Sequence, residues 1–151
     1  MQIRFLTRIF LSAGLLAGAT AGADPAPDPS LEVEVTGAHN ARGRIGCLLF
    51  QSEKGFPKDA GRARQRVWVV IDPGKSAICQ FRSVPVGDYA VAVMHDENGN
   101  GELDSNWVGA PTEGYGFSNN AKAGTFSPPP FDKARLHLAT SARWPVQLVY
   151  P

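Results

Sequence analysis

Short runs of strand-forming residues, separated by turn-forming residues, recur along most of this chain. Leu31–Thr36 alternates apolar and polar residues, as a strand with one solvent-facing side does. Residues 44–51 are apolar at nearly every position, which is typical of a central strand covered on both faces. Similar runs occupy residues 65–71, 76–81, 89–95, 133–138 and 144–150. Without long helices between them, the seven runs predict an all-β fold, a seven-stranded antiparallel Greek-key sandwich of the immunoglobulin-like class.

Composition limits the size of the fold and the partners of this chain. Its 151 residues are 43% apolar, enough for one hydrophobic core, which we expect in a single domain over residues 31–151. The 16 Gly and 12 Pro residues exclude a helical bundle. Fifteen basic and fourteen acidic residues form no block of one sign, so we expect no nucleic-acid partner.

Residues 1–23 have the pattern of a secretory signal peptide. Arg4 and Arg8 supply positive charge, an apolar run follows, and Ala-Gly-Ala at residues 21–23 is a cleavage site. The alternative is a retained N-terminal anchor, but the apolar run is too short to span a bilayer comfortably. We expect a mature chain that is exported to the periplasm or the medium, has no membrane span, and starts with a Pro-rich lead-in at residues 24–30.

Export changes the interpretation of the two cysteines. Cys47 and Cys79 stand 32 positions apart, and in an oxidising compartment such a pair predicts a disulfide. Two buried free thiols are the alternative, because spacing alone does not show that the sulfur atoms meet. Catalytic thiol chemistry is disfavoured, since neither cysteine belongs to a C-x-x-C motif or stands beside a histidine.

Residues 96–130 interrupt the alternation of strands and turns. They are rich in Gly, Asn, Ser and Pro, and a loop of this length inside a compact domain is usually functional or disordered. The aromatic residues Trp107, Tyr115, Phe117 and Phe126 disfavour disorder, because their rings bury apolar area. We therefore expect a long ordered loop, packed over one end or face of the sandwich.

The start of this loop carries a pattern of oxygen-bearing side chains. It resembles the first part of an EF-hand calcium loop, in which alternate side chains turn inward and a glycine at position 6 permits the bend. Gly101 holds position 6. The predicted calcium ligands are Asp96, Asn98, Asn100 and Asp104 through their side chains and Glu102 through its carbonyl.

The match to the EF-hand is incomplete. Position 12 is Trp107 instead of a bidentate glutamate, and Glu113 is the nearest carboxylate that would complete the shell. With few charged ligands we expect weak affinity, roughly 10⁻⁴–10⁻³ M. The alternative is a metal-free turn in which Asn and Asp side chains bind the local backbone.

His95 directly precedes the loop and suggests a general base beside Asp96. Neighbouring residues of a strand point to opposite faces, however, so the two side chains need not meet. His39 and His137 share no metal-ligand spacing with His95. We expect the histidines to be structural or surface residues and keep a hydrolase, using His95 and the loop carboxylates, as an alternative.

Four segments together resemble a known family. They are G-A-H-N-A-R-G at residues 37–43, G-F-P at 55–57, H-D-E-N-G-N-G-E-L-D at 95–104 and E-G-Y-G-F-S-N-N at 113–120. The chain resembles the exported bacterial proteins grouped as domain of unknown function 2141. The resemblance implies a small periplasmic or secreted β-sandwich and no established reaction, and it does not support the pairing of the cysteines.

Residues 113–120 place aromatic rings beside amide groups. Tyr115 and Phe117 stand two residues apart, and Asn119 and Asn120 offer donors and acceptors. Rings that stack on apolar faces, with amides that set orientation, suit a sugar or a peptide end. The alternative is a loop that these rings pin to the sandwich.

These features favour an exported, non-enzymatic β-sandwich that binds a ligand or partner through residues 96–130. The architecture is similar to accessory modules of transthyretin-like proteins, an analogy of fold alone. Calcium at residues 96–104 is the one cofactor predicted, and a sugar, a peptide or an envelope protein the partner. The alternatives are the hydrolase and a structural envelope protein that pairs through an edge strand.

Overall fold

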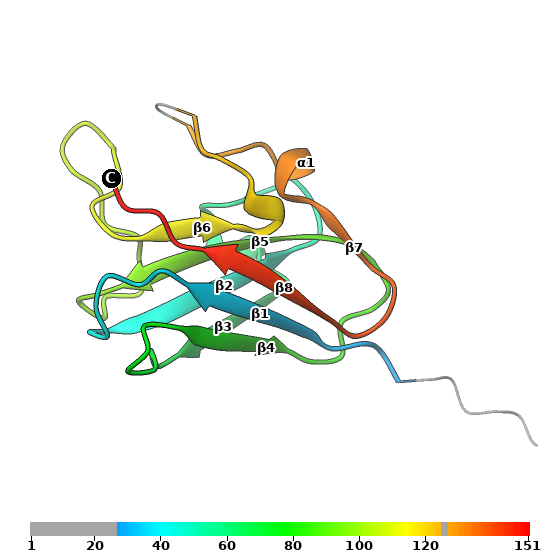
Figure 1. Cartoon of the computed structure of the whole chain (residues 1–151). Helices are drawn as coiled ribbons and strands as arrows, with labels where there is room; N and C mark the ends of the chain where they lie inside the picture. Colours follow the sequence, from blue (N-terminus) through cyan, green and yellow to red (C-terminus); the bar gives the residue numbers. More distant parts are fainter. Residues whose placement is uncertain (1–26, 125–126) are drawn as a thin grey trace, which may run out of the picture.

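The computed structural model describes residues 27–124 and 127–151, so the predicted signal peptide and Phe126 lie outside the described residues (Figure 1). Eight strands form two sheets. The strands are β1 (Leu31–Thr36), β2 (Arg44–Phe50), β3 (Gln65–Val69), β4 (Ala77–Phe81), β5 (Gly87–Asp96), β6 (Tyr115–Phe117), β7 (Leu136–Leu138) and β8 (Ala142–Gln147). The predicted all-β class is confirmed.

The pairing of the strands differs from the prediction in two ways. One sheet has the order β4-β1-β8, and the other has the order β3-β2-β5-β6, with β7 paired to the start of β5. β6 is an eighth strand, formed within the segment predicted to be loop. β1 runs antiparallel to β4 but parallel to β8, so the sandwich is not wholly antiparallel. This parallel pair is possible because the whole second sheet lies between β1 and β8 in sequence and supplies the long crossover.

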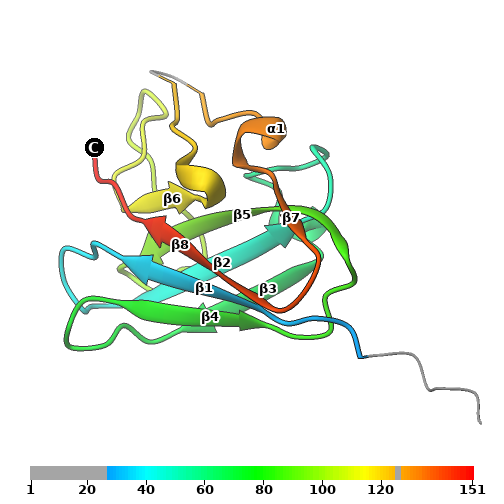
Figure 2. The same cartoon turned by 45° about the vertical axis from the view of Figure 1, so that its right-hand side comes forward.

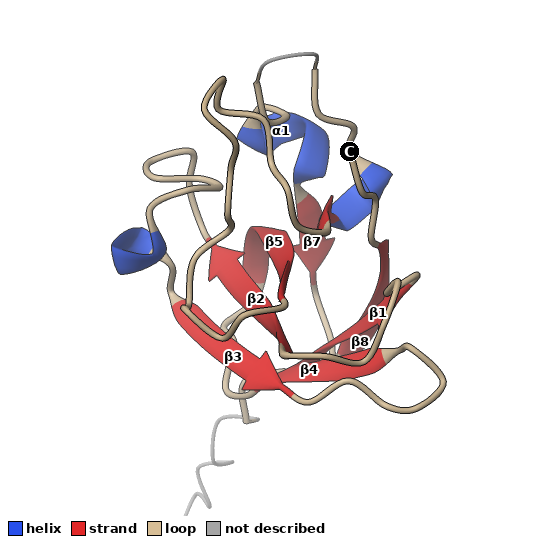
Figure 3. Cartoon of the chain, turned by 90° about the vertical axis from the view of Figure 1, so that its left-hand side faces the viewer, coloured by secondary structure: helices blue, strands red, loops and turns tan. Residues whose placement is uncertain are grey.

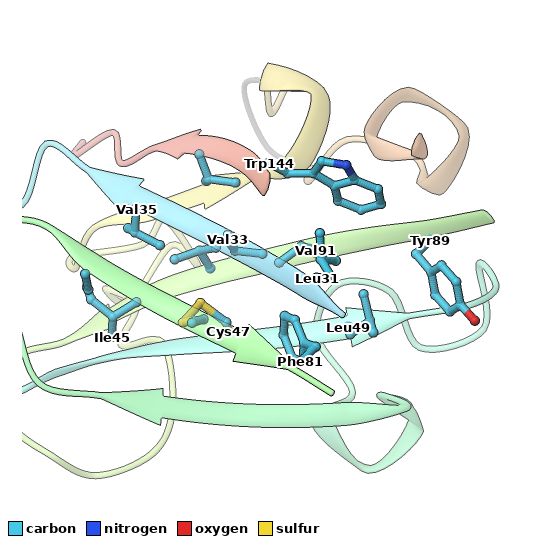
Figure 4. Close-up of a cluster of buried hydrophobic side chains, with 14 of the residues drawn as sticks. Leu31, Val33, Val35, Ile45, Cys47, Leu49, Phe81, Tyr89, Val91 and Trp144 are labelled. Atoms are coloured by element: carbon cyan, nitrogen blue, oxygen red, sulfur yellow. A yellow bond between two sulfur atoms is a disulfide. The ribbon is translucent and has the colours of Figure 1, made fainter. Parts of the chain in front are cut away.

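The main hydrophobic core lies between the two sheets (Figure 4). Every second residue of β1 points into it, which explains the alternation of that strand. Side chains from one face of β2 and one face of β5 also pack in this core. Its largest fully buried apolar side chains are Tyr89, Phe81, Leu31, Ile45, Leu49 and Leu138.

A second apolar cluster covers the outer face of the five-stranded sheet. Leu48 and Phe50 of β2 point into this cluster, where Phe56, Phe117 and Phe131 pack against them. The loops and short helices that carry this cluster lie on one side of the strands in Figures 2 and 3. β2 is therefore buried on both faces, as its sequence predicts, and much of the long loop forms a third layer.

A disulfide joins the two sheets. Cys47 lies in β2 and Cys79 in β4, and their sulfur atoms are bonded (Figure 4). The predicted pairing is confirmed.

The described residues contain three helices, all of them short. They are the 3₁₀ helices η1 (Ala60–Arg62) and η2 (Ser118–Asn120) and the single α-helical turn α1 (Phe131–Ala134). α1 occupies the start of the strand predicted at residues 133–138, of which only β7 forms. Among the described residues, no helix is long and apolar enough to cross a bilayer.

Candidate functional site

Asp96, the last residue of β5, holds the loop that follows it. Its side chain is fully buried, and its Oδ1 accepts a hydrogen bond from the Gly99 amide at 2.7 Å. Its Oδ2 accepts from the Gly101 amide and from Nε of Arg44, both at 2.9 Å. Asp96 therefore pins the start of the loop to the first residue of β2.

The surroundings of Asp96 favour its ionised form. Burial opposes ionisation, but the hydrogen bonds from Arg44 and from the Gly101 and Gly99 amides outweigh it and lower the pKa of the carboxyl group. Arg44 also donates to the Gly99 carbonyl at 3.2 Å, and its guanidinium carbon lies 4.1 Å from the centre of the Trp68 ring. Arg44 was not among the predicted site residues, although a charged residue that opens an apolar strand indicates a partner of opposite charge.

Three of the predicted calcium ligands meet beyond Asp96. Asn98 and Asn100 donate from their side-chain amides to the two carboxylate oxygens of Asp104, at 2.6 and 2.9 Å. Their own side-chain oxygens accept from the backbone amides of Asn100 and Glu102, at 3.0 and 2.9 Å. These are the local bonds of the metal-free alternative. Asn98, Asn100 and Asp104 thus converge, whereas Asp96 turns toward the loop amides and Glu102 is exposed.

Glu113 closes the loop from the other side. Its carboxylate is buried and accepts from the backbone amides of Glu97 at 2.8 Å and Asp104 at 3.0 Å. In this arrangement it anchors both ends of the loop instead of completing a ligand shell. Residues 27–124 and 127–151 contain no group of three or more His, Cys, Asp or Glu side chains placed to hold a metal ion. Calcium binding stays a prediction.

Residues 104–112 form a small hairpin that projects from this anchored loop. The Thr112 amide donates to the Asp104 carbonyl, and the Asn106 amide to the Ala110 carbonyl, both at 2.8 Å. The Asn106 side-chain oxygen accepts from the amides of Val108 and Ala110 at 3.1 and 3.0 Å. Trp107 stands at the tip and is 96% exposed.

His95 belongs to a different environment from Asp96. Its ring is fully buried, with Nε2 2.8 Å from the Arg42 carbonyl and Nδ1 2.6 Å from the Tyr150 hydroxyl. A carbonyl only accepts, so Nε2 carries the proton and Nδ1 accepts from Tyr150. Burial raises the pKa of Tyr150, which keeps the hydroxyl protonated, and the His39 ring stacks on it. His95 therefore ties the C-terminal segment to the sandwich, as a structural histidine.

A groove of about 400 Å³ lies where the edges of the two sheets meet, and we call it the seam groove. Its lining includes Tyr115, Phe117, Asn120, Lys122, Gln147 and Val149. Three of these, Tyr115, Phe117 and Asn120, are predicted ligand candidates. The fourth candidate, Asn119, is used elsewhere, because its amide donates to the Lys133 carbonyl at 3.0 Å.

Pairing between distant parts of the chain builds the seam groove. The amide of Tyr115 donates to the Val149 carbonyl at 3.0 Å, and that of Val149 to the Tyr115 carbonyl at 2.8 Å. At Gly116 a Cβ atom would lie 2.8 Å from the Gln147 carbonyl oxygen, so only glycine permits this close approach. Gln147 and Val149 were not among the predicted site residues, because nothing near them in sequence marks them as neighbours of β6.

The family comparison covers most of this architecture. The model of a family described as "Uncharacterized protein conserved in bacteria (DUF2141)" matches residues 33–144. The chain belongs to this family. The resemblance noted from the sequence motifs is thereby confirmed. The matched residues include the loop between β5 and β6 and the strand β6 itself. Comparison with curated proteins and with solved structures gave no match.

Proposed function

We propose that this protein is an exported β-sandwich that binds a ligand in the seam groove and catalyses no reaction. The observation that carries the proposal is the groove itself, where aromatic residues of β6 lie beside polar side chains from the segment that follows β6 and from β8. Apolar walls with a few polar groups are the usual lining of a ligand site, and a volume of about 400 Å³ is within the usual range.

The lining favours a ligand with an apolar face and a polar edge. Tyr115 offers ring surface and Phe117 is largely buried in the wall, whereas Asn120 and Gln147 offer amide donors and acceptors and Lys122 a positive charge. A sugar ring or the end of a peptide has this combination of surfaces. An envelope protein would meet the same groups through an exposed peptide segment.

The contacts of His95 argue for a binding protein over the hydrolase. Both ring nitrogens are engaged, by the Arg42 carbonyl and the Tyr150 hydroxyl, and the ring has no exposed surface. Asp96 accepts from Arg44 and from two loop amides. Neither group is free to take a proton from a substrate, which general-base catalysis requires.

Weak calcium binding through residues 96–104 is part of the same proposal. The convergence of Asn98, Asn100 and Asp104 supports it, since rotation of the two amides would present oxygen atoms beside the Asp104 carboxylate. Asp104 is the one carboxylate at this point, so the ion would order the loop and bind weakly.

Export is supported by the pattern of residues 1–23 and is compatible with the disulfide, a bond that forms mainly in oxidising compartments. We expect the protein from fractionated cells to be recovered outside the cytoplasm, with Asp24 as its first residue and without free thiols, by mass spectrometry. Recovery of the uncleaved chain from the cytoplasm with two free thiols would reject export.

Nuclear magnetic resonance titrations test the seam groove directly. The probes are a neutral trisaccharide, cellotriose, and the tripeptide Ala-Phe-Ala, each added to the mature protein. We expect shifts of the amides of Tyr115, Phe117 and Gln147 with at least one probe. Gln147→Ala should weaken that binding several-fold, because it removes an amide from the groove.

Gln51→Ala is the matched control, since Gln51 is also exposed and does not line the groove. Shifts that map to another surface, or binding that Gln147→Ala leaves unchanged, would reject the groove as the site. Recovery of the protein in stable envelope complexes that tolerate groove variants would favour the structural alternative.

A further inference from the structure

We propose that Trp107 of one copy of this protein docks in the seam groove of a second copy. The inference rests on the proposed function, because it names a partner for the same groove. Two features that are otherwise unexplained belong to one chain: a fully displayed tryptophan and an aromatic groove without a protein side chain in it.

Trp107 lies at the tip of a hairpin that projects from the surface of the protein. The hairpin of residues 104–112 is closed by backbone hydrogen bonds and by the Asn106 side chain, and Glu113 anchors its base through the Asp104 amide. In Figure 1 this yellow-green hairpin stands away from the strands near the C-terminal end of the chain. Val108 beside Trp107 is 54% exposed. A tryptophan held on a rigid, exposed support loses little entropy on docking, which makes it a good anchor.

The charges around the tip favour a basic partner over an anionic surface. Residues 105–111 hold no charge, Glu102 and Asp104 stand at the base of the hairpin, and no Lys or Arg occurs between Glu97 and Lys122. Carboxylates are repelled by anionic lipid. A groove with a lysine at its rim is complementary to them, and Lys122 lines the seam groove of this same chain.

The contact is intermolecular and weak. Trp107 is 96% exposed, so it does not occupy the groove of its own copy. A tryptophan side chain buries roughly 150–250 Å². A stable interface buries about 800 Å² per partner. We therefore expect association that depends steeply on protein concentration and is governed by the single tryptophan.

Sedimentation velocity across a concentration series of the mature protein provides the first test. We expect the average mass to rise with concentration and Trp107→Ala to weaken association by at least about tenfold, as loss of a central tryptophan anchor does. Val70→Ala is the control, since Val70 is 78% exposed and lies elsewhere on the surface. A protein that stays monomeric, or association that Trp107→Ala leaves intact, would overturn the proposal.

A mixing experiment distinguishes this contact from non-specific aggregation. The double variant Lys122→Glu/Val149→Glu keeps the tip and blocks the groove, whereas Trp107→Ala keeps the groove and removes the tip. Neither variant should associate alone, but an equimolar mixture should form a one-to-one complex. Val86→Glu, at another exposed valine, is the control for the added charge and should behave as the unchanged protein.

The same variants separate this inference from the proposed function. Trp107→Ala is expected to be monomeric, so a titration of that variant with cellotriose or Ala-Phe-Ala tests the groove alone. Ligand binding without self-association would reject the inference and leave the groove as a ligand site. Association of the monomeric protein with phosphatidylcholine vesicles, lost in Trp107→Ala, would assign the tip to lipid and likewise reject the inference.

Discussion

His95 and Asp96 are neighbours in β5, both fully buried, and each is bound on a different side of the sheet. His95 faces the Tyr150 hydroxyl and the Arg42 carbonyl, whereas Asp96 faces Arg44 and the amides of the loop. The alternation of side chains along a strand therefore separates two groups that are adjacent in sequence. Each polar group is satisfied locally, and each fixes a different segment to the end of the strand.

Replacement of Asp96 by Asn should destabilise the protein by roughly 1–3 kcal/mol at neutral pH. The substitution removes the charged carboxylate that accepts hydrogen bonds from Arg44 and from two backbone amides. The pKa of Asp96 in the folded protein lies below its ordinary value of 3.8, so its contribution is present above that pH and is lost as the pH falls through the folded pKa. Urea denaturation at a series of pH values measures the effect.

The stability difference between the original protein and Asp96→Asn should therefore shrink in acid. Asp72→Asn serves as the control, because Asp72 is exposed in the turn between β3 and β4. If this stability difference is the same at pH 7 and pH 3, the ionised carboxylate of Asp96 does not stabilise the protein through its contact with Arg44.

The segment between β5 and β6 is ordered although the small hairpin of residues 104–112 is its one regular feature. Carboxylates at its two ends replace the missing backbone ladder: Asp96 accepts from Gly99 and Gly101, and Glu113 accepts from Glu97 and Asp104. Each bond satisfies an amide that a strand or helix would otherwise pair. The hairpin that displays Trp107 is thereby held at a fixed base.

Calcium should bind to this segment with a dissociation constant of roughly 10⁻⁴–10⁻³ M. At a tenfold excess over that constant, the stability should rise by about 1.4 kcal/mol, which thermal unfolding detects as a higher Tm. Isothermal titration of chelator-treated protein measures the affinity.

Asp104→Asn should weaken calcium binding at least tenfold, because it removes the carboxylate at which Asn98 and Asn100 meet. Asp72→Asn should leave the binding unchanged. Absence of heat and of any Tm increase at millimolar calcium would identify the loop as a metal-free turn.

Three layers make up the whole molecule. The two sheets enclose the main core. Segments between β2 and β3 and between β5 and β7 cover the outer face of the five-stranded sheet. The disulfide between β2 and β4 and the Tyr115–Val149 backbone pair at the seam groove both join the two sheets. The groove thus lies at a place where the two sheets are joined, so its shape depends on the whole sandwich.

Removal of the disulfide should destabilise the protein by about 3–4 kcal/mol, from the loop entropy of the unfolded chain between Cys47 and Cys79. The double variant Cys47→Ala/Cys79→Ala, compared with the oxidised protein by guanidinium denaturation, measures the change. The single variants should be no more stable than the double variant. A loss below about 1 kcal/mol would show that the sheets hold together without the bond.

Local sequence pattern predicted β1 to β5, since alternation and apolar runs report which faces of a strand are covered, and it placed Tyr115, Phe117 and Asn120 in a candidate site. It did not predict the parallel pairing of β1 with β8, the contact of Arg44 with Asp96, or the place of Gln147 and Val149 in the groove. These features join residues far apart in the chain. They depend on strand register and on how the sheet edges meet, and a single sequence carries no local signal for either.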